Sequence, residues 1–432
     1  METHLPWAAP SAPGPLDAAL RVPGSKSMTA RALVLAANSE GSSTLRAPLR
    51  ARDTKLMAAG LRAMGCHVST ADDNLWLLRS RPLAGPARVD VGLAGTVLRF
   101  LPPVAVLARG AVAFDGQPGA GRRPMAPLIG ALRALGARIE TGNGLPFTVH
   151  GAGRIAGGPV TIDASASSQL VSGLLLSAAG FDRGVVVRHV GSPVPKPHLD
   201  LTVHMLRAAG AGVDDSRPDV WSVEPGRLKG RAWDIEPDLA SAAPFLAAAL
   251  VTGGTVTVRG WPAASGQPAR RLLDVLRQMG AEAALTPRGL LVRGCGAVHG
   301  ITADLSGLAD VSAVLAAVAA LAGSPSRMRT QEPPERLARL AGTLAGLGAD
   351  VTPEPDGLSI RPVPLHGGTL RTHGDRRLAH AGAVLGLAVP GIRLDDVACT
   401  AKTMPDFPRL WSTMVHGFEG GSAEAEARVR RG

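Results

Sequence analysis

The sequence predicts an α/β protein built from six similar units, because two marks repeat along the chain. The first mark is a helix-like stretch closed by glycine, as in Leu61–Gly65 and Leu132–Gly136, with copies about 70 residues apart. The closing glycines are Gly65, Gly136, Gly210, Gly280 and Gly348, with a fainter copy at Leu410–Gly417. Each glycine stands where a helix C-cap is expected, and a short strand-like run follows it.

The second mark is a small polar turn that opens an apolar helix about 40 residues before each glycine. Helix N-termini carry unpaired N–H groups and partial positive charge, so several of them at one centre would attract anions. The simpler interpretation is that these turns only start helices, but Lys and Arg in several of them favour a site. The turns are Gly24–Ser27, Ala94–Thr96, Ser167–Gln169, Asp238–Ser241, Asp310–Ser312 and Asp375–Arg377.

Composition limits the class of protein. At 432 residues and 45% hydrophobic, the chain can form two domains with their own cores. It shows no membrane-spanning run and no signal peptide, so we expect a soluble, cytoplasmic protein. The three cysteines are scattered, which predicts neither disulfides nor a zinc site. We expect flexible tails at Met1–Pro15 and at about 420–432.

The net charge of +11 raises the question of nucleic acid. The arginines are spread singly, aromatic residues make up only 3% and tyrosine is absent, so the chain lacks a base-stacking surface. A positive field also suits small polyanionic substrates. We expect such substrates, with neither nucleic acid nor membrane as a partner.

The most informative local string is Gly24-Ser25-Lys26-Ser27, followed one turn later by Arg31. At a helix start it offers N–H donors, hydroxyls and an ammonium, which suit a phosphate or carboxylate. It is not a Walker loop, since the first glycine and its spacing are missing.

This string, together with four others, resembles the EPSP synthase family of enolpyruvyl transferases. The others are Leu93–Thr96 with Arg99, Arg123-Pro124, Ser167–Gln169 and Lys402–Asp406, in the family's order from about Val22 to Trp411. The resemblance implies the enolpyruvyl transferase fold, an inside-out α/β barrel of two domains with three βαβαββ-like repeats each. It places one domain at 25–236 and the other at 1–24 plus 237–420, followed by a flexible tail at 421–432.

The resemblance also implies a reaction: transfer of the enolpyruvyl group of phosphoenolpyruvate to the 5-hydroxyl of shikimate 3-phosphate, with loss of phosphate. It implies a monomer that needs no metal or cofactor. By motif position the catalytic residues are Lys26, Asp310 and Glu332. The phosphoenolpyruvate set is Lys26, Gly95, Arg123, Gln169, Arg336, Arg377 and Lys402. The shikimate 3-phosphate set is Lys26, Ser27, Arg31, Ser167, Ser168, Gln169 and Asp310.

Departures from the family pattern are concentrated in a few places. Alignment on Arg336-Leu337 puts Pro333 where the family has a glutamate, and a one-residue insertion restores Glu332 to that role. Arg376 replaces a histidine, and Pro195-Lys196-Pro197-His198 lacks a serine that would meet the substrate phosphate. Two alternatives therefore stay open: a relative that uses another hydroxylated acceptor, and a catalytically impaired relative that binds ligands. The stretch Gln331–Arg336 discriminates between them.

Overall fold

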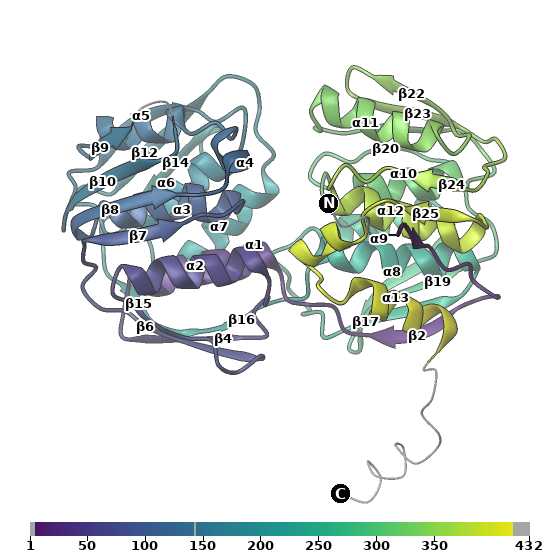
Figure 1. Ribbon diagram of the computed structural model, residues 1–432, viewed down its shortest axis with the longest axis horizontal. Helices are drawn as coiled ribbons and strands as arrows, with labels where there is room; N and C mark the ends of the chain where they lie inside the picture. Colours follow the sequence, from purple (N-terminus) through teal and green to yellow (C-terminus); the bar gives the residue numbers. More distant parts are fainter. Residues whose placement is uncertain (1–4, 142–143, 418–432) are drawn as a thin grey trace, which may run out of the picture. The chain divides into compact units, whose positions relative to one another are not determined.

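The computed structural model describes residues 5–141 and 144–417, and the chain divides into two compact units. One unit is Pro23–Glu236, and the other combines Met1–Val22 with Pro237–Gly432. Pro23 and Gly24, expected in the second domain, belong to the first unit, and the expected tail at 421–432 lies outside the described residues. Figure 1 shows both units in ribbon form.

Each unit contains a threefold repeat of one mixed sheet. In each sheet two parallel strands adjoin antiparallel partners. In the unit Pro23–Glu236, the first sheet has the strand order β16 (Ala232–Asp234), β4 (Ser42–Arg46), β6 (Leu75–Arg79), β5 (His67–Ser69). The second has the order β7 (Ala87–Asp90), β8 (Arg109–Asp115), β10 (Phe147–Ala152), β9 (Arg138–Thr141). The third has the order β11 (Gly158–Asp163), β12 (Val185–Val190), β14 (Val220–Val223), β13 (Val213–Asp214). The same unit also contains a small parallel pair of strands, β3 (Ser39–Glu40) and β15 (Leu228–Lys229).

The second unit repeats this plan with the N-terminal segment built in. Its sheets are β18 (Ala281–Thr286), β19 (Gly289–Gly294), β17 (Thr255–Arg259), β2 (Asp17–Leu20); β20 (Thr302–Asp304), β21 (Ser326–Arg329), β23 (Gly357–Arg361), β22 (Asp350–Glu354); and β1 (Trp7–Ala8), β25 (Ile392–Leu394), β24 (Gly368–Leu370). In Figure 1 the purple strand β2 lies beside β17, with which it pairs in parallel.

The prediction of a flexible tail at Met1–Pro15 is wrong for residues 5–15, which the structure describes. Trp7 and Ala8 pair with β25, and the Ala9 and Ala12 amides donate to the carbonyls of Ile392 and Leu387. Ala9 is buried, and the Trp7 ring lies 6.3 Å from that of Phe407. These contacts are to residues far away in the chain, so the alanine- and proline-rich composition of the segment did not reveal them.

Six helices form the centres of the two units and are buried on all sides. They are α1 (Lys26–Ala37), α3 (Gly95–Ala105) and α6 (Gln169–Ala178) in one unit, and α8 (Leu239–Thr252), α10 (Ser312–Ala320) and α12 (Arg376–Ala388) in the other. Within each unit these three helices pack against one another. Each begins at one of the polar turns that the sequence predicted. Ser25, Asp238 and Asp375 cap their helices with a side-chain oxygen.

Six further helices carry one polar face and end at the repeated glycines. They are α2 (Arg52–Ala63), α5 (Ala126–Ala134), α7 (Pro197–Ala208), α9 (Ala269–Gln278), α11 (Pro334–Ala345) and α13 (Phe407–His416), and the chain also contains the short α4 (Pro118–Gly121) and η1 (Ala398–Lys402). The first five closing glycines have φ between 91° and 107°, which favours glycine. The predicted α/β class and the repeat are confirmed. No helix of the described residues is long and apolar enough to span a membrane.

Candidate active site

Lys26 is the first residue of α1, and a buried carboxylate holds its side chain. Its Nζ lies 3.5 Å from Oδ2 of Asp53, whose side chain is only 2% exposed. Asp53 lies in the first turn of α2 and also pairs with Arg52 at 3.1 Å. A buried carboxylate needs such partners, so Asp53 orients the ammonium. Sequence reasoning missed Asp53; its only signal is an acidic residue in the first turn of a helix.

Arg31, one turn into α1, is almost completely buried at 1% exposure. Its guanidinium donates to the Thr202 hydroxyl at 2.8 Å, to the Ser172 hydroxyl at 3.3 Å, and to the carbonyls of Ser27 and His198. Burial lowers the pKa of Arg31 to about 9. Four of its five N–H groups are thus used within the protein. Arg31 joins α1 to α6 and α7, and only one donor remains for the ligand contact expected from the sequence.

Gly95, Arg123 and Gln169 come together where α3 and α6 begin. A Cβ added to Gly95 would lie 2.5 Å from Nη1 of Arg123 and 3.5 Å from Oε1 of Gln169. Arg123 also donates to the Leu93 carbonyl at 3.0 Å, and Arg99 donates to Oε1 of Gln169 at 3.0 Å. Two guanidinium groups, a side-chain amide and a helix N-terminus therefore gather in one place, where they can hold an anion.

The serines predicted to hold the shikimate moiety lie at the start of α6. Ser168 is its N-cap and is buried, and the Ser167 hydroxyl accepts from the Gln169 amide at 3.3 Å. Ser27 is half-buried in the first turn of α1. At the divergent Pro195–His198 string, Lys196 is exposed and forms the N-cap of α7.

In the other unit, Glu332 forms the centre of an ion-pair cluster. Its Oε1 accepts from Nη1 of Arg377 at 2.6 Å, and its Oε2 from Nη1 of Arg336 at 3.1 Å. The Ser312 hydroxyl, at the first residue of α10, lies 3.5 Å from Oε1. Arg377 also pairs with Asp375 at 2.5 Å. The cluster joins the N-termini of α10, α11 and α12, and a small pocket is lined by these residues.

The electrostatics of this cluster follow from its burial. The Asp375 carboxyl is largely buried, which alone would raise its pKa, but the hydrogen bond and charge of Arg377 lower it to about 2. Burial alone would lower the pKa of Arg377, yet its hydrogen bonds to the Asp375 carboxylate and the charges of Glu332, Asp375 and Asp310 raise it well above its ordinary value. Both groups are therefore fixed as ions at neutral pH.

Within Gln331–Arg336, the residue that lies in the ion-pair cluster is Glu332, not Pro333. Glu332 is buried, whereas Pro333 is exposed and serves as the N-cap of α11, with Pro334 as its first residue. Proline is tolerated at the first positions of a helix because its missing N–H has no partner there anyway. The two prolines thus start the helix and leave the carboxylate directed at Arg377.

Asp310 precedes α10 and is about half exposed, with Oδ1 3.6 Å from Nη2 of Arg376. Burial, and then the charge of Arg376, lowers the pKa of His380 to about 3, so this histidine is neutral. Lys402 ends η1, and the hydroxyl of its neighbour Thr403 contacts that of Ser241 at 3.4 Å. In this unit the structure thus brings Glu332, Arg336 and Arg377 together and links Asp310 to Arg376.

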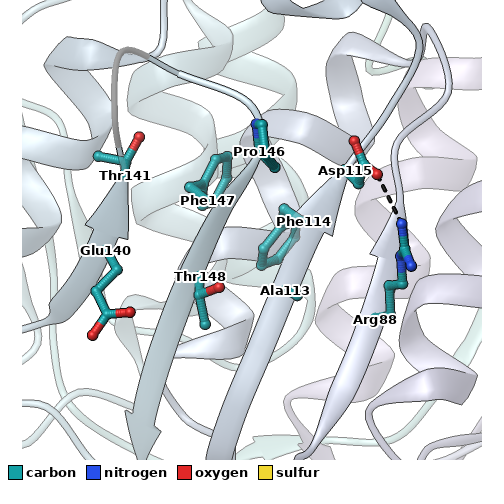
Figure 2. A pocket seen from close by; sticks show the side chains of 9 residues that line it. All are labelled: Arg88, Ala113, Phe114, Asp115, Glu140, Thr141, Pro146, Phe147 and Thr148. Carbon is teal, nitrogen blue, oxygen red and sulfur yellow. Dashed lines mark hydrogen bonds and ion pairs between the residues drawn. The ribbon is translucent and has the colours of Figure 1, made fainter.

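A separate hollow lies on the outer face of the sheet β7–β8–β10–β9 (Figure 2). Arg88 and Asp115, on the neighbouring strands β7 and β8, pair at one side of it at 2.9 Å, and Phe114, which stacks on Phe147, is fully buried. None of the residues predicted to act on substrate lines it, so we do not assign the reaction to this hollow.

Comparisons with known proteins agree with the sequence resemblance. The model of the EPSP synthase (3-phosphoshikimate 1-carboxyvinyltransferase) family matches residues 10–411. The chain is 49% identical to a 3-phosphoshikimate 1-carboxyvinyltransferase of Mycobacterium ulcerans, over 97% of this chain and 100% of that protein. Two solved structures, at 23% and 20% identity, share the fold.

The first is an EPSP synthase from Acinetobacter baumannii, with a TM-score of 0.81 over 95% of this chain and 97% of that one. The second is the enolpyruvyl transferase NikO from Streptomyces tendae, with a TM-score of 0.74 over 94% and 96%. The enolpyruvyl transferase fold expected from the sequence is therefore confirmed. A family match over nearly the whole chain, together with a close full-length relative, shows that this protein belongs to the EPSP synthase family of 3-phosphoshikimate 1-carboxyvinyltransferases.

Proposed function

We propose that this chain transfers the enolpyruvyl group of phosphoenolpyruvate to the 5-hydroxyl of shikimate 3-phosphate and releases phosphate. The observation that carries the proposal is its 49% identity to a 3-phosphoshikimate 1-carboxyvinyltransferase along that protein's whole length. The clusters on the two units supply the charges that this reaction needs.

The phosphate and carboxylate of phosphoenolpyruvate need cations and N–H donors. On one unit Gly95, Arg123 and Gln169 provide them at the start of α3 and α6, with Lys26 at the start of α1. On the other unit the donors are Arg336, Arg377 and Lys402. Ser27, Ser167 and Ser168 add hydroxyls for the shikimate moiety. Charge-assisted hydrogen bonds of this kind are about twice as strong as neutral ones.

We assign the proton transfers to the carboxyl groups of Asp310 and Glu332 and to Lys26. Asp310 accepts the proton of the attacking hydroxyl as the hydroxyl oxygen bonds to the enol carbon, and Glu332, in its protonated carboxylic acid form, gives a proton to the methylene carbon and becomes a carboxylate. The Glu332 carboxylate then takes a proton back from the resulting methyl group as phosphate leaves the tetrahedral intermediate, which restores the double bond. Both Glu332 oxygens pair with guanidinium groups. One of these ion pairs must therefore open, and an anionic substrate that takes over an arginine would open it.

The buried position of Glu332 also favours a working enzyme over an impaired relative. In an impaired relative we would expect the exposed Pro333 to occupy the position that Glu332 holds between Arg336 and Arg377. Retention of this carboxylate leaves an acid in the cluster. The feature that favours a different acceptor is the Pro195–His198 string, which lacks a serine for the substrate phosphate.

The deciding experiment measures phosphate release by the purified chain with phosphoenolpyruvate alone, with shikimate 3-phosphate alone, and with both. Release that requires both substrates supports the proposal. Release with phosphoenolpyruvate and another hydroxylated acceptor only would reassign the substrate. Absence of release with any acceptor would leave the family and fold but remove the catalytic role.

We also propose that the enzyme acts as a monomer in the cytoplasm. Cys66, Cys295 and Cys399 are all free thiols, which suits a reducing compartment. The exposed large apolar side chains of the described residues are few: Leu5, Val190, and the pair Leu75 and Leu77 on one face of β6. Light scattering over a range of concentrations tests the oligomeric state, and a mass of twice 44.2 kDa would contradict it.

A further inference from the structure

Arg376 is a cation in a place that the ordinary rules of helix stability disfavour. It is the first residue of α12, where the positive end of the helix dipole repels a cation, and Arg377 follows it directly. Its side chain is only 13% exposed, and its Nε is buried without a hydrogen-bond partner among the described residues. Proteins break such local rules mainly at functional sites, so Arg376 calls for a functional explanation.

The carboxylate that Arg376 approaches is that of Asp310. Nη2 of Arg376 lies 3.6 Å from Oδ1 of Asp310. This distance is longer than an N–H···O hydrogen bond, so the contact acts through charge. The Asp310 side chain is 46% exposed, and ion pairs at such exposed positions stabilise a fold little. Stability therefore does not explain why the Arg376 side chain is drawn into the fold.

The other ionisable groups at the start of α12 do not take over this role. All three guanidinium nitrogens of Arg377 are hydrogen-bonded to Asp375 or Glu332. Burial, and then the charge of Arg376, lowers the pKa of His380 to about 3, so this histidine is neutral. Arg376 is thus the cation of α12 that pairs with Asp310.

The remaining elements that pack against α10, the helix that follows Asp310, are α8, α11 and β23. Their charged groups, with the residue before α11, have other partners or face solvent. They are the cap Asp238, Arg336 with Glu332, Arg361 with Asp350, and the exposed Glu335 and Arg339. The charge of Arg376 is therefore the one that these elements direct at Asp310.

We propose that Arg376 is a positioning residue whose fixed charge keeps Asp310 ionised, and so able to accept the proton of the attacking hydroxyl, when anionic substrates are bound. The proposal rests on the proposed function, in which Asp310 is the base. Both substrates carry a phosphate, and negative charge brought near a carboxylate favours its protonated form. Arginine keeps its proton throughout the pH range of enzymes, so its charge opposes this effect at every pH.

The first test replaces Arg376 with Gln, which removes the charge and keeps N–H donors. One unit charge at 3.6 Å in water-like surroundings corresponds to about one pH unit. The acid limb of the kcat–pH profile should therefore move up by about that amount, while kcat well above the limb changes much less. Arg376→Lys keeps the charge and should leave the limb near its wild-type position. An unmoved limb in Arg376→Gln would overturn the proposal.

Arg271→Gln is the matched control. Arg271 lies in the first turn of α9 in the same unit, with Nη2 3.9 Å from Oδ2 of Asp304. This change also removes an arginine–aspartate pair at the start of a helix, but outside the proposed site, and should leave the profile unchanged.

Thermal unfolding tests for a merely structural role. The midpoint of Arg376→Gln should not fall, because the change removes a cation from the helix N-terminus and a buried N–H without a partner. A lower midpoint together with an unmoved acid limb would mark Arg376 as a structural residue and overturn the proposal.

A chemical readout needs no activity. A water-soluble carbodiimide with an added amine converts protonated carboxyl groups into amides, and peptide mass spectrometry measures the extent at each residue. Asp310 is exposed enough to react, and the pH of its half-maximal labelling should rise by about one unit in Arg376→Gln. Asp274, an exposed aspartate that pairs with Arg277, is the internal reference and should not shift. An unchanged value for Asp310 would overturn the proposal.

The two readouts separate this proposal from the proposed function. If the wild type releases no phosphate, the proposed function fails, while labelling still decides whether Arg376 keeps Asp310 ionised. A shift in labelling without a shift of the acid limb would show that the charge acts on Asp310 but that this carboxylate does not limit the reaction, which also overturns the proposal.

Discussion

At the scale of single residues, Lys26 carries the sharpest expectation. Its ammonium, held by the buried Asp53, belongs to both proposed ligand sets. Lys26→Ala should abolish phosphoenolpyruvate-dependent phosphate release, because a cation and a proton-transfer group are lost together. Lys55→Ala, on the exposed face of α2, is the matched control and should keep wild-type rates. An active Lys26→Ala enzyme would refute the site assignment.

Gly95 gives a second residue-scale prediction. The added methyl of Gly95→Ala would lie 2.5 Å from Nη1 of Arg123, so the arginine side chain must move. We expect the KM for phosphoenolpyruvate to rise about tenfold, since one charge-assisted contact is displaced. Steady-state kinetics measures it. Gly121→Ala, which would meet no atom within 4 Å, should leave KM unchanged, and equal effects of the two changes would argue against the steric cause.

At the scale of elements, the start of α12 should make stability depend on pH. The pKa of Asp375 is lowered to about 2 in the folded chain, against about 3.9 when unfolded. Its stabilising effect is therefore complete above about pH 4 and lost as pH falls toward 2. The loss amounts to about 2 kcal/mol in the free energy of unfolding.

Asp375→Asn removes this titration and keeps a residue that can cap the helix. Denaturant unfolding of both proteins between pH 5 and pH 2 should show their free-energy difference shrinking as the pH falls. A difference that stays constant over this range would mean that the ion pair with Arg377 contributes little.

The contact between α3 and α6 gives another element-scale prediction. The Cβ of Gly173→Ala would lie 2.2 Å from the backbone oxygen of Arg99, which cannot rotate away as a side chain could. The helices must separate, and we expect a loss of about 1–3 kcal/mol in unfolding free energy. Gly130→Ala in α5, which meets nothing within 4 Å, should be neutral or stabilising. Thermal unfolding of the two variants compares them directly.

At the scale of the whole molecule, the sequence predicted the repeat and the fold class because every unit carries the same local signals. The closing glycines and the capping turns recur at fixed distances, and each has a conformational reason. Contacts between distant residues leave no such pattern. The pairing of β16 with β4, the burial of Arg31 and the carboxylate of Asp53 behind Lys26 all depend on which elements meet.

The N-terminal segment completes one of the two units. Residues 5–22 supply β1 and β2 to the unit formed mainly by 237–417, so that unit should not fold without them. The chain leaves and re-enters this unit at neighbouring points, since the Ser25 amide donates to the Glu236 carbonyl at 2.7 Å. A short glycine–serine linker can therefore replace residues 23–236.

We expect residues 1–22, such a linker and residues 237–432 to form a protein that unfolds cooperatively. The same protein without residues 1–22 leaves an edge of β17 unpaired and should aggregate or remain unfolded. Near-ultraviolet circular dichroism and thermal unfolding distinguish the two, and Trp261 and Trp411 report on both proteins. If the shortened protein folds equally well, β1 and β2 lie on this unit without being needed for its stability.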